Sequence, residues 1–455
     1  MVELFRSTRR LLLFLFEGAL IAMFFIVASM FTRGSNKALT DPYLFAKGAM
    51  VVLVLQAANY YAGFYDLISV ARARKLYERM LQGLFIGSIV LFLIFYVAPP
   101  LSVGRGAILA TFALTAVLVP AWRVLYNMVS TNAQFLRRAV ILGNGELARE
   151  IAKMIRESPD HGLELAGMLA RDRDQVDTRR GIIGTYNQLQ EIVAAQDIQR
   201  VLVAYPDRRG TLPVDQLLEV KFRGVEVEEG VQFYERNTLK IYVRELKPSQ
   251  LIFAEGFTSR PGTRRLKRLM DVVAAGLGLV LAAPLILFTI LAIRLDSKGP
   301  ILYRQVRAGE FGRLFTILKF RSMKIDAEKS GAQFAKENDD RVTRVGRIIR
   351  KTRIDEIPQL WNVLLGDMSM VGPRPERPVF IEQLEQQVPF FKQRLYVKPG
   401  VTGHAQVRAK YGASTEDHLE KLQYDLYYIK SYSFWFDLSI LLDTVKVVLL
   451  RIGSR

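Results

Sequence analysis

The chain contains no cysteine, and its only histidines are His161, His404 and His418. Without cysteine it can form no disulfide, offer no thiolate to a metal and use no thiol as a nucleophile. Structural zinc sites are built from cysteine and histidine ligands, so three scattered histidines argue against such a site. Disulfide frameworks, thiolate metal centres and thiol catalysis are therefore excluded.

Acidic residues are also scarce relative to basic ones. There are 63 lysines and arginines against 44 aspartates and glutamates, which gives a net charge of +19. This excess indicates anionic partners, such as phospholipid headgroups or nucleotide diphosphates. Nucleic acid is the rival interpretation, but we find no recognition motif for it and expect no nucleic-acid partner.

Half of the residues are hydrophobic, and they gather in long runs. Four runs lie at residues 11–31, 44–64, 80–97 and 107–125, each close to the roughly 20 residues that span a bilayer. The first is too long for a signal peptide and lacks the small-residue cleavage site. The sequence predicts a membrane protein in which residues 1–130 form a four-helix transmembrane bundle. A length of 455 residues suggests two or three domains.

Basic residues order the loops of this bundle. They cluster before the first run, between the second and third, and after the fourth, whereas the other two loops carry only Arg33, Lys37 and Arg105. By the positive-inside rule, both ends of the bundle face the cytoplasm. Glu17 lies within the first run, where an acid can mark a site. Its closeness to the basic N-terminus favours a place at the membrane interface equally well.

Residues 137–244 alternate short apolar segments with helical ones, which is typical of a parallel sheet of Rossmann type. Gly143-Asn144-Gly145-Glu146-Leu147-Ala148 is a G-x-G-x-x-A fingerprint between the first strand and the first helix, where glycine lets a phosphate approach the backbone. The predicted strands are 139–142, 163–169, 201–204 and 225–227. The first predicted helix follows the fingerprint and ends near residue 157, and two more span 188–196 and 214–222.

The fingerprint makes Gly143 and Gly145 candidates for nucleotide binding. However, Asp172 lies further along the chain than the usual ribose-binding acid, and this segment has no Tyr-x-x-x-Lys pair for hydride chemistry. We therefore favour a structural or regulatory role for the Rossmann-like module over cofactor binding.

A connector at 245–261 leads to a basic stretch, 264–268, and then to an apolar run, 269–295, which Pro284 interrupts. The run is long enough to cross the membrane, so a fifth span is one interpretation. However, basic residues stand at both ends, and a proline within a helix frees a carbonyl and bends the axis. A re-entrant, broken helix that enters and leaves one leaflet accounts for these features, and we favour it.

Asp355 and Glu356 form an adjacent acid pair. Pro358 sets a helix start close to the pair, because proline is tolerated in the first turn of a helix, and Gly366 ends that helix. A helix N-terminus suits a phosphate beside a carboxylate, although a solvated acid pair in an ordinary first turn is the simpler alternative. The surrounding cations are Arg347, Arg350, Lys351 and Arg353, and the predicted apolar face of the helix carries Leu360, Trp361, Leu364 and Leu365.

Two further stretches carry candidate phosphate-binding cations. In Leu-Lys-Phe-Arg-Ser-Met at 318–323, Lys319 and Arg321 alternate with other residues, as in a strand with one charged face. In Pro-Arg-Pro-Glu at 373–376, two stiff neighbours hold Arg374, which suits a pre-placed guanidinium that binds phosphate in bidentate fashion. A solvated edge strand and an arginine satisfied by turn carbonyls are the plainer alternatives.

These motifs precede two more, Lys-Pro-Gly-Val-Thr-Gly-His-Ala-Gln-Val at 398–407 and Leu-Gln-Tyr-Asp-Leu-Tyr-Tyr at 422–428. Together with the acid pair they resemble the bacterial sugar transferases known as monotopic phosphoglycosyl transferases. Enzymes of this family move a sugar 1-phosphate from a UDP-sugar to a polyprenol phosphate, usually undecaprenyl phosphate. The resemblance covers residues 264–455 and implies a monotopic α/β catalytic domain with a re-entrant helix at 269–295.

The resemblance implies a role for each candidate residue. Asp355 would attack the β-phosphate of the donor, with UMP leaving, and form a covalent phosphosugar intermediate. Glu356 would be a metal ligand or a base for the polyprenol phosphate, and Mg²⁺ is the expected cofactor, with Asp355 and Glu356 as ligands. Asp425 and Asp437 would help to organise the site or its metal. His404 stands where the family often has an aromatic residue and is not assigned as a base. The phosphate-binding set is Lys319, Arg321, Arg350 and Arg374.

The expected partners are a UDP-sugar, undecaprenyl phosphate and membrane lipid, and the bundle and Rossmann-like module offer surface for a homodimer. The implied location is the bacterial inner membrane, with the soluble domains facing the cytoplasm. The resemblance leaves the sugar open: glucose or galactose is usual for large members that serve exopolysaccharide synthesis, and N-acetylated hexosamines remain alternatives.

Two rival functions remain at this point. A membrane-anchored nucleotide-sugar dehydratase or epimerase also joins a four-helix bundle to a Rossmann module, but residues after 245 supply no cofactor domain with a Tyr/Lys pair. A non-enzymatic assembly factor for polysaccharide export leaves the acid pair and Pro-Arg-Pro unexplained. Release of UMP in the presence of polyprenol phosphate separates the three functions.

Overall fold

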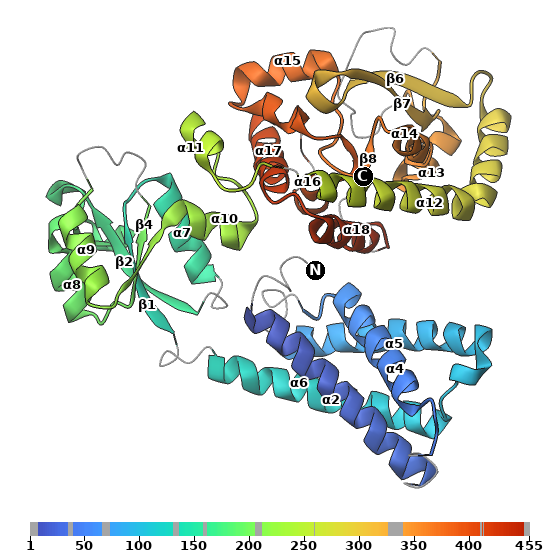
Figure 1. The fold of residues 1–455 in the computed structure, drawn as a ribbon, viewed down its shortest axis with the longest axis horizontal. Helices are drawn as coiled ribbons and strands as arrows, with labels where there is room; N and C mark the ends of the chain where they lie inside the picture. Colours follow the sequence, from blue (N-terminus) through green and yellow to red (C-terminus); the bar gives the residue numbers. More distant parts are fainter. Residues whose placement is uncertain are drawn as a thin grey trace. The chain divides into compact units, whose positions relative to one another are not determined.

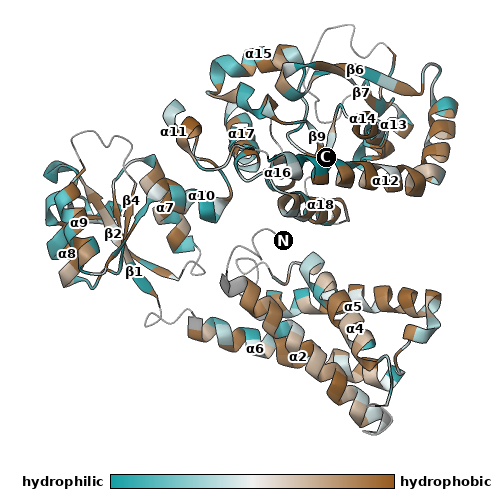
Figure 2. Cartoon of the chain, in the orientation of Figure 1, coloured by the Kyte–Doolittle hydropathy of each residue, from teal (hydrophilic) through white to brown (hydrophobic). Residues whose placement is uncertain are grey.

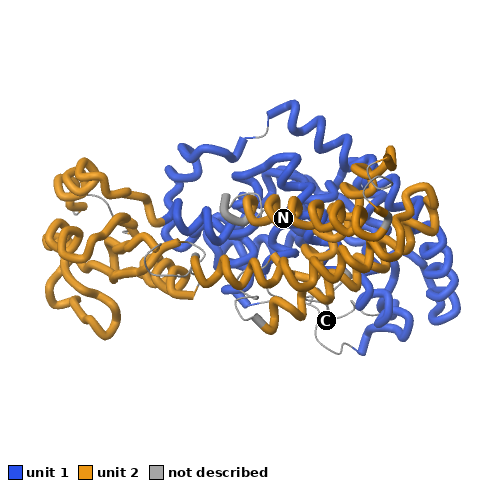
Figure 3. Tube along the Cα trace, turned by 90° about the horizontal axis from the view of Figure 1, so that it is seen from below, with its two compact units in different colours: residues 1, 231–455 blue, residues 2–230 orange. Residues whose placement is uncertain are grey.

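The structure is a computed structural model of the chain. It is mostly helical, with several apolar helices and one parallel α/β sheet (Figure 1). By packing, the chain divides into two compact units, which Figure 3 colours separately. In chain order, the first unit is residues 2–230 (orange, labelled unit 2 in the figure) and the second is residues 231–455 (blue, labelled unit 1). The structure describes residues 8–34, 40–65, 73–130, 136–157, 162–204, 212–258, 260–325, 340–409, 412 and 414–449.

The first unit begins with four long apolar helices at the predicted runs. Each contains a segment long and apolar enough to cross a membrane. The first packs on the second and fourth, and the third also packs on the second and fourth. Many of their apolar side chains are exposed, and Figure 2 colours much of these helices brown for hydrophobic residues. An exposed apolar surface of this kind fits contact with lipid. The four helices are α2 (Thr8–Arg33), α4 (Leu44–Ala62), α5 (Ala73–Val97) and α6 (Arg105–Ser130).

Glu17 lies inside the packed helices and pairs with Arg123 of α6. The Arg123 guanidinium is 2.9 Å from the Glu17 carboxylate, and both side chains are buried. Arg123 also lies over the rings of Phe64 and Tyr65, at 5.2 and 5.6 Å from their centroids. A buried charge needs a partner of this kind. Glu17 is therefore buried among the helices and paired there with Arg123.

The same unit contains a five-stranded parallel sheet in the order β3-β2-β1-β4-β5. This order, with the direction of winding reversing between β1 and β4, confirms the Rossmann type. Val140, Leu169 and Val201 are buried in its core. The strands are β1 (Arg137–Leu142), β2 (Leu163–Ala170), β3 (Ile182–Thr185), β4 (Arg200–Val203) and β5 (Glu226–Glu229), and the main helices are α7 (Glu146–Glu157), α8 (Leu189–Ala195) and α9 (Val214–Phe222).

One strand of this sheet, β3, was not predicted. It contains only Ile-Ile-Gly-Thr and lies between two short 3-10 turns, so its apolar pattern is too brief to separate from a loop. The other strands and helices fall at the predicted positions within a few residues.

Helix α10 (Gly230–Thr238) and the residues after it pack in the second unit. Glu235 pairs with Lys430 at 2.6 Å, Lys240 pairs with Glu420 at 2.5 Å, and the Ile241 N–H donates to a backbone carbonyl of α17 (Thr415–Lys430). The packing boundary at residue 230 therefore comes before the predicted module end at 244.

The second unit is built around α12 (Pro261–Asp296), a single helix of 36 residues. The helix is continuous through Pro284, and its axis turns sharply part-way along its length (Figure 1), as expected of a helix that contains a proline. Around it lie an antiparallel hairpin, a short parallel strand pair and several helices (Figure 1). These are β6 (Leu302–Ala308) with β7 (Leu314–Phe320), β8 (Ser369–Val371) with β9 (Gly400–Thr402), α11 (Pro248–Phe253), α13 (Arg344–Lys351), α14 (Gln359–Leu365), α15 (Pro378–Gln387), α16 (His404–Arg408), α17 and α18 (Phe434–Leu449).

Both ends of α12 are fixed to this unit, and its middle is exposed. Near its start, Lys267 and Asp271 are buried against β8 and α18. Near its end, Ile293 packs with Phe320 of β7 and Ile349 of α13. Between these anchors the outward residues are apolar, and Leu281 is 80% exposed. A 36-residue helix therefore presents an uncovered apolar surface with both ends held by the same body.

Candidate active site

Asp355 and Glu356 lie in a 3-10 turn, Ile354–Glu356, directly before α14. Arg353 opens this turn in the left-handed region, with φ of 60°, and Pro358 is the N-cap of α14. The helix ends at Gly366, which has φ of 94°. The predicted start and end of the helix are therefore confirmed.

The predicted apolar residues of α14 are not its most buried ones. Its buried residues are Gln359, Asn362 and Val363, whereas Trp361 and Leu365 are 52% and 63% exposed. Asn362 faces inward, where its amide hydrogen-bonds to the backbone of β7.

Three cations from three elements meet the Glu356 carboxylate. Its Oε1 atom lies 2.9 Å from Arg374, 3.2 Å from Lys319 Nζ and 3.8 Å from Arg353. Burial raises the pKa of Glu356, but these cations lower it by more, so the net pKa is well below its usual range. Glu356 is therefore a permanent anion that holds Lys319 and Arg374 at one point.

Asp355 behaves differently from its neighbour. Burial and the adjacent Glu356 charge raise the pKa of Asp355 to about 6, although Lys319, Arg350 and Arg374 act in the opposite direction. The helix N-terminus and Arg350 favour the charged form of Asp355, whereas burial and the Glu356 charge oppose it more strongly, and with a pKa of about 6 the group is still mostly ionised at neutral pH. The two carboxyl groups thus have pKa values pushed far apart, a pattern typical of catalytic acid pairs.

The Pro-Arg-Pro loop that carries Arg374 is held by its carbonyl groups. Arg394 donates to the Arg374 carbonyl at 3.1 Å, and Arg307 donates to the Pro375 carbonyl at the same distance. Backbone N–H groups of Gly400 and Ala308 bind the carbonyls on either side. Because the loop is fixed, the Arg374 guanidinium is held beside the acid pair, where it contacts Glu356.

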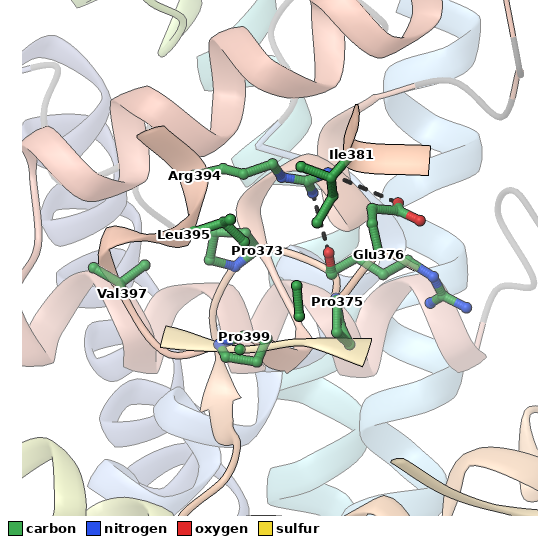
Figure 4. Close-up of a pocket in the computed structure, with 11 residues that line it drawn as sticks. Pro373, Pro375, Glu376, Ile381, Arg394, Leu395, Val397 and Pro399 are labelled. Carbon is green, nitrogen blue, oxygen red and sulfur yellow. Dashed lines mark hydrogen bonds and ion pairs between the residues drawn. The ribbon is translucent and has the colours of Figure 1, made fainter. Parts of the chain in front are cut away.

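This loop lines a small pocket, shown in Figure 4, in which Arg394 lies beside Glu376. Its guanidinium lies 2.8 Å from Asp425 of α17 and 3.8 Å from Glu376. Burial, together with Glu376, raises the pKa of Asp425 to about 6 against the influence of Arg394. Asp425 therefore fixes Arg394, which in turn fixes the backbone of Arg374.

Asp437 is part of a second buried network. Lys267 Nζ lies 2.7 Å from Asp437, and the Tyr428 hydroxyl donates to it at 2.7 Å. Both Lys267 and Tyr428 also donate to the Val371 carbonyl at the end of β8. Asp437 thus ties α12 to the strand that leads into the Pro-Arg-Pro loop and does not itself reach the acid pair.

The structure brings most of the predicted cations together, with one exception. Lys319 and Arg374 contact Glu356, and Arg350 of α13 is close enough to lower the pKa of Asp355. Arg321 instead donates to the carbonyl and hydroxyl of Ser297 at the end of α12. The strand ends at Phe320, so the alternation that would align Arg321 with Lys319 stops before it.

Three residues at the site were missed or left without a role. Arg353 was named as a neighbouring cation, and its place next to the pair was a usable signal. Arg394 and Asn362 gave no such signal, because their partners lie far away in the sequence.

His404 is buried, with Nε2 3.1 Å from the Leu239 carbonyl and its ring against Tyr424 and Phe436. The sequence assigned it no catalytic role.

Within the described part of the chain, no group of three or more histidine, aspartate or glutamate side chains could hold a metal. Glu356 Oε1 is already shared by three cations, so Asp355 supplies the freer oxygens. Mg²⁺ in phosphoryl-transfer sites is often held by one or two carboxylates together with substrate phosphates. The residues fit a Mg²⁺ ion of that kind, and they do not fit an all-protein metal cage.

In the Rossmann-like module, the two fingerprint glycines have different surroundings. A Cβ on Gly143 would lie 2.2 Å from the Ala204 carbonyl oxygen, and Gly143 has φ of 134°. A Cβ on Gly145 would meet nothing within 4 Å. Gly143 therefore serves the close packing of β1 and β4, and Gly145 is the glycine with space beside it.

An acid pair with separated pKa values, clamped by cations beside a long uncovered apolar helix, defines a phosphoryl-transfer type of site. Residues 262–451 match the family model described as bacterial sugar transferase, and residues 61–218 match one described as a CoA-binding domain. The chain belongs to the bacterial sugar transferase family.

Several relatives carry informative names. The UDP-N-acetylgalactosamine-undecaprenyl-phosphate N-acetylgalactosaminephosphotransferase of Aeromonas hydrophila is 47% identical over 190 residues, which are 42% of this chain and 45% of the relative. The UDP-glucose:undecaprenyl-phosphate glucose-1-phosphate transferase of Caulobacter vibrioides is 46% identical over 185 residues, 40% of this chain and 69% of the relative. The protein of the same name from Escherichia coli is 33% identical over 351 residues, 74% of each chain. The matched part thus spans less than half of the Aeromonas protein.

Proposed function

We propose that this protein transfers a sugar 1-phosphate from a UDP-sugar to undecaprenyl phosphate and releases UMP. The single observation that carries the proposal is the clamped acid pair, in which Lys319 and Arg374 hold Glu356 beside a reactive Asp355. The names of the relatives support the donor and acceptor classes. The reaction would be the first membrane step of exopolysaccharide or glycoconjugate synthesis.

The chemistry divides into two displacements at one phosphorus atom. An Asp355 carboxylate oxygen attacks the β-phosphorus, the bond from that phosphorus to the bridging oxygen breaks, and UMP leaves with the bond electrons. The sugar 1-phosphate is then an acyl phosphate on Asp355. An oxygen of undecaprenyl phosphate attacks the same phosphorus, which frees the Asp355 carboxylate and forms the diphosphate-linked product. Asp355 needs no separate base, because it is about nine-tenths ionised at pH 7 with its pKa of about 6.

The neighbouring charges stabilise the transferred phosphate. Lys319, Arg350 and Arg374 surround the acid pair and would balance charge that develops on phosphate oxygens. A pKa well below its usual range makes Glu356 a poor base, so we favour charge-holding and metal binding over the base role.

Mg²⁺ is the cofactor we propose, held by Asp355 and Glu356 with the donor phosphates completing its coordination. Bound there, it would neutralise charge on the diphosphate. Loss of turnover in EDTA, restored by added Mg²⁺, tests this, and full activity in EDTA would contradict it.

The identity of the sugar is open among the donors that the relatives' names mention. N-acetylgalactosamine and glucose appear in the names of the relatives given above, and a further relative is named an undecaprenyl-phosphate galactose phosphotransferase. Purified protein should be incubated with undecaprenyl phosphate and each UDP-sugar, and UMP should be measured. A dehydratase or epimerase would change the sugar without releasing UMP, and an assembly factor would do neither, so either result would reject the proposal.

We further propose that α2, α4, α5 and α6 form a transmembrane bundle and that α12 is re-entrant, with the soluble parts in the cytoplasm of a bacterium. The support for re-entry is that both ends of α12 are held by one body while its middle exposes apolar side chains. A homodimer stays a prediction, which size-exclusion chromatography with light scattering on detergent-solubilised protein tests.

For the Rossmann-like module we propose a structural or regulatory role. Gly145→Ala tests this better than a change at Gly143, because Gly145 has space for a methyl group and Gly143 does not. Transferase activity within a few fold of wild type, and no co-purifying nicotinamide cofactor, are expected. Stoichiometric NAD(H) in the purified protein would overturn the proposal.

A further inference from the structure

Strand β7 belongs to a two-stranded sheet, and β6 pairs with only one of its edges. On the other edge the side chain of Asn362 replaces a strand. The Leu318 N–H donates to Asn362 Oδ1 at 3.0 Å, and Asn362 Nδ2 donates to the Thr316 carbonyl at 2.8 Å. One side-chain amide therefore satisfies both a donor and an acceptor of the strand.

These two hydrogen bonds join the two elements that build the acid-pair cluster. Asn362 belongs to α14, the helix that follows the turn carrying Asp355 and Glu356. Leu318 directly precedes Lys319, whose Nζ lies 3.2 Å from Glu356. The amide of Asn362 therefore helps to fix where Lys319 lies relative to the acid pair.

Asn362 makes these hydrogen bonds from a buried position, since it is 1% exposed. Next to it lies an apolar cluster formed from α12, α14, β7 and the region of β8, with Ala275, Ile317, Val363 and Met368 at its centre. Without the amide, the Leu318 N–H and the Thr316 carbonyl lose their partner on this edge, which costs free energy unless these groups find another partner. Loss of the amide should thus let β7 shift against α14.

We propose that Asn362 is a positioning residue for the transfer reaction, whose side-chain amide acts as a third strand and fixes Lys319 against the acid pair. Asn362 touches no reacting atom, and it works through Lys319. The inference rests on the proposed function, since its readout is turnover.

A double-mutant cycle tests the coupling between Asn362 and Lys319. UMP release is measured with undecaprenyl phosphate and, in parallel, UDP-N-acetylgalactosamine, UDP-glucose and UDP-galactose. Asn362→Ala should lower kcat about 100-fold, as a misplaced group does, with KM for the accepted donor within about threefold. Lys319→Met should lower kcat by about 100-fold or more, because it removes a charge-stabilising group. The double variant should be no more than a few fold below Lys319→Met.

Val363→Ala is the matched control, because Val363 is the next residue of α14 and fully buried but makes neither hydrogen bond. It should lower the melting temperature, leave kcat within about threefold, and combine additively with Lys319→Met. Asn362→Asp keeps the shape and the acceptor of the side chain but loses the donor to the Thr316 carbonyl. It takes the place of Asn362→Ala in the double-mutant cycle if the alanine variant does not accumulate.

Wild-type kcat in the Asn362 variants, or effects that simply multiply with Lys319→Met, would overturn the inference alone. A wild-type protein that releases no UMP from any of the three donors would overturn the proposed function and this inference with it.

Discussion

The guanidinium of Arg374 lies 2.9 Å from the carboxylate of Glu356, and the same oxygen lies 3.2 Å from Lys319 Nζ of strand β7. The glutamate of the acid pair is therefore committed to these cations. Its neighbour Asp355 keeps a pKa of about 6 and is available to react. This division of work between adjacent carboxylates leads to the first two predictions.

Asp355→Asn should abolish turnover and any phosphosugar adduct, because the amide keeps the shape of the side chain but is not a nucleophile. Glu356→Gln should lower turnover by about 100-fold or more, since it removes the anion that gathers Lys319 and Arg374, yet still allow an adduct from UDP-sugar and Mg²⁺ alone. Mass spectrometry of the intact protein measures the adduct. A sugar-phosphorylated Asp355→Asn protein would show that the nucleophile is elsewhere.

The acidic limb of the kcat/KM profile should lie near pH 6. The reactive form of Asp355 is the deprotonated one, so activity is present above the raised pKa and is lost as the pH falls through about 6. Glu356 should add no second limb in this range, because its pKa is well below its usual range. Initial rates of UMP release from about pH 5 to about pH 8 locate the pH at which this limb falls.

Arg350→Met should move that limb to higher pH, because Arg350 lowers the pKa of Asp355. Arg344→Met is the matched control, since it removes the same charge from an exposed position of the same helix. If both variants gave the same limb, Arg350 would not act on Asp355.

Removing Arg394 should destabilise the protein and weaken donor binding together. Arg394→Met leaves Asp425 buried without its partner, which typically costs about 3–5 kcal/mol, and it frees the carbonyl of Arg374. Thermal unfolding in detergent and KM for the UDP-sugar measure the two effects. Adding Asp425→Asn should recover part of the stability, because the unpaired buried charge is then gone.

The control for this prediction is the exposed pair of Lys392 and Glu385, where Lys392→Met should change stability by less than about 1 kcal/mol. Equal losses of stability in Arg394→Met and Lys392→Met would mean that the buried Arg394–Asp425 pair contributes no more to stability than an exposed pair.

Single cysteines at Arg264 and Lys298 should react with a membrane-impermeant maleimide from the same side of the membrane. The chain has no other cysteine, so each label reports one site. A cysteine at Arg105, the first residue of α6, should react from the opposite side and serves as the reference. Labelling of Arg264→Cys and Lys298→Cys from opposite sides would end the re-entrant proposal and favour a fifth span.

Local pattern determined much of this protein. The four apolar runs, the alternation of strands and helices around the Gly143 fingerprint, and the helix between Pro358 and Gly366 are all in the structure close to their predicted positions. Each depends on neighbours within a few residues, through hydrophobic period, glycine conformation or the missing N–H of proline. Family motifs added the acid pair and the Pro-Arg-Pro loop, because these are contiguous stretches.

Only the tertiary structure decided which charges meet. Lys319 reaches Glu356, whereas Arg321, two residues further, turns to Ser297 because the strand has ended. Arg394 and Asn362 bind partners that no short pattern connects to them. The raised pKa of Asp355 comes from burial and from the Glu356 charge. Both contacts and burial depend on how distant segments pack, and electrostatic interactions act through that space and not along the chain.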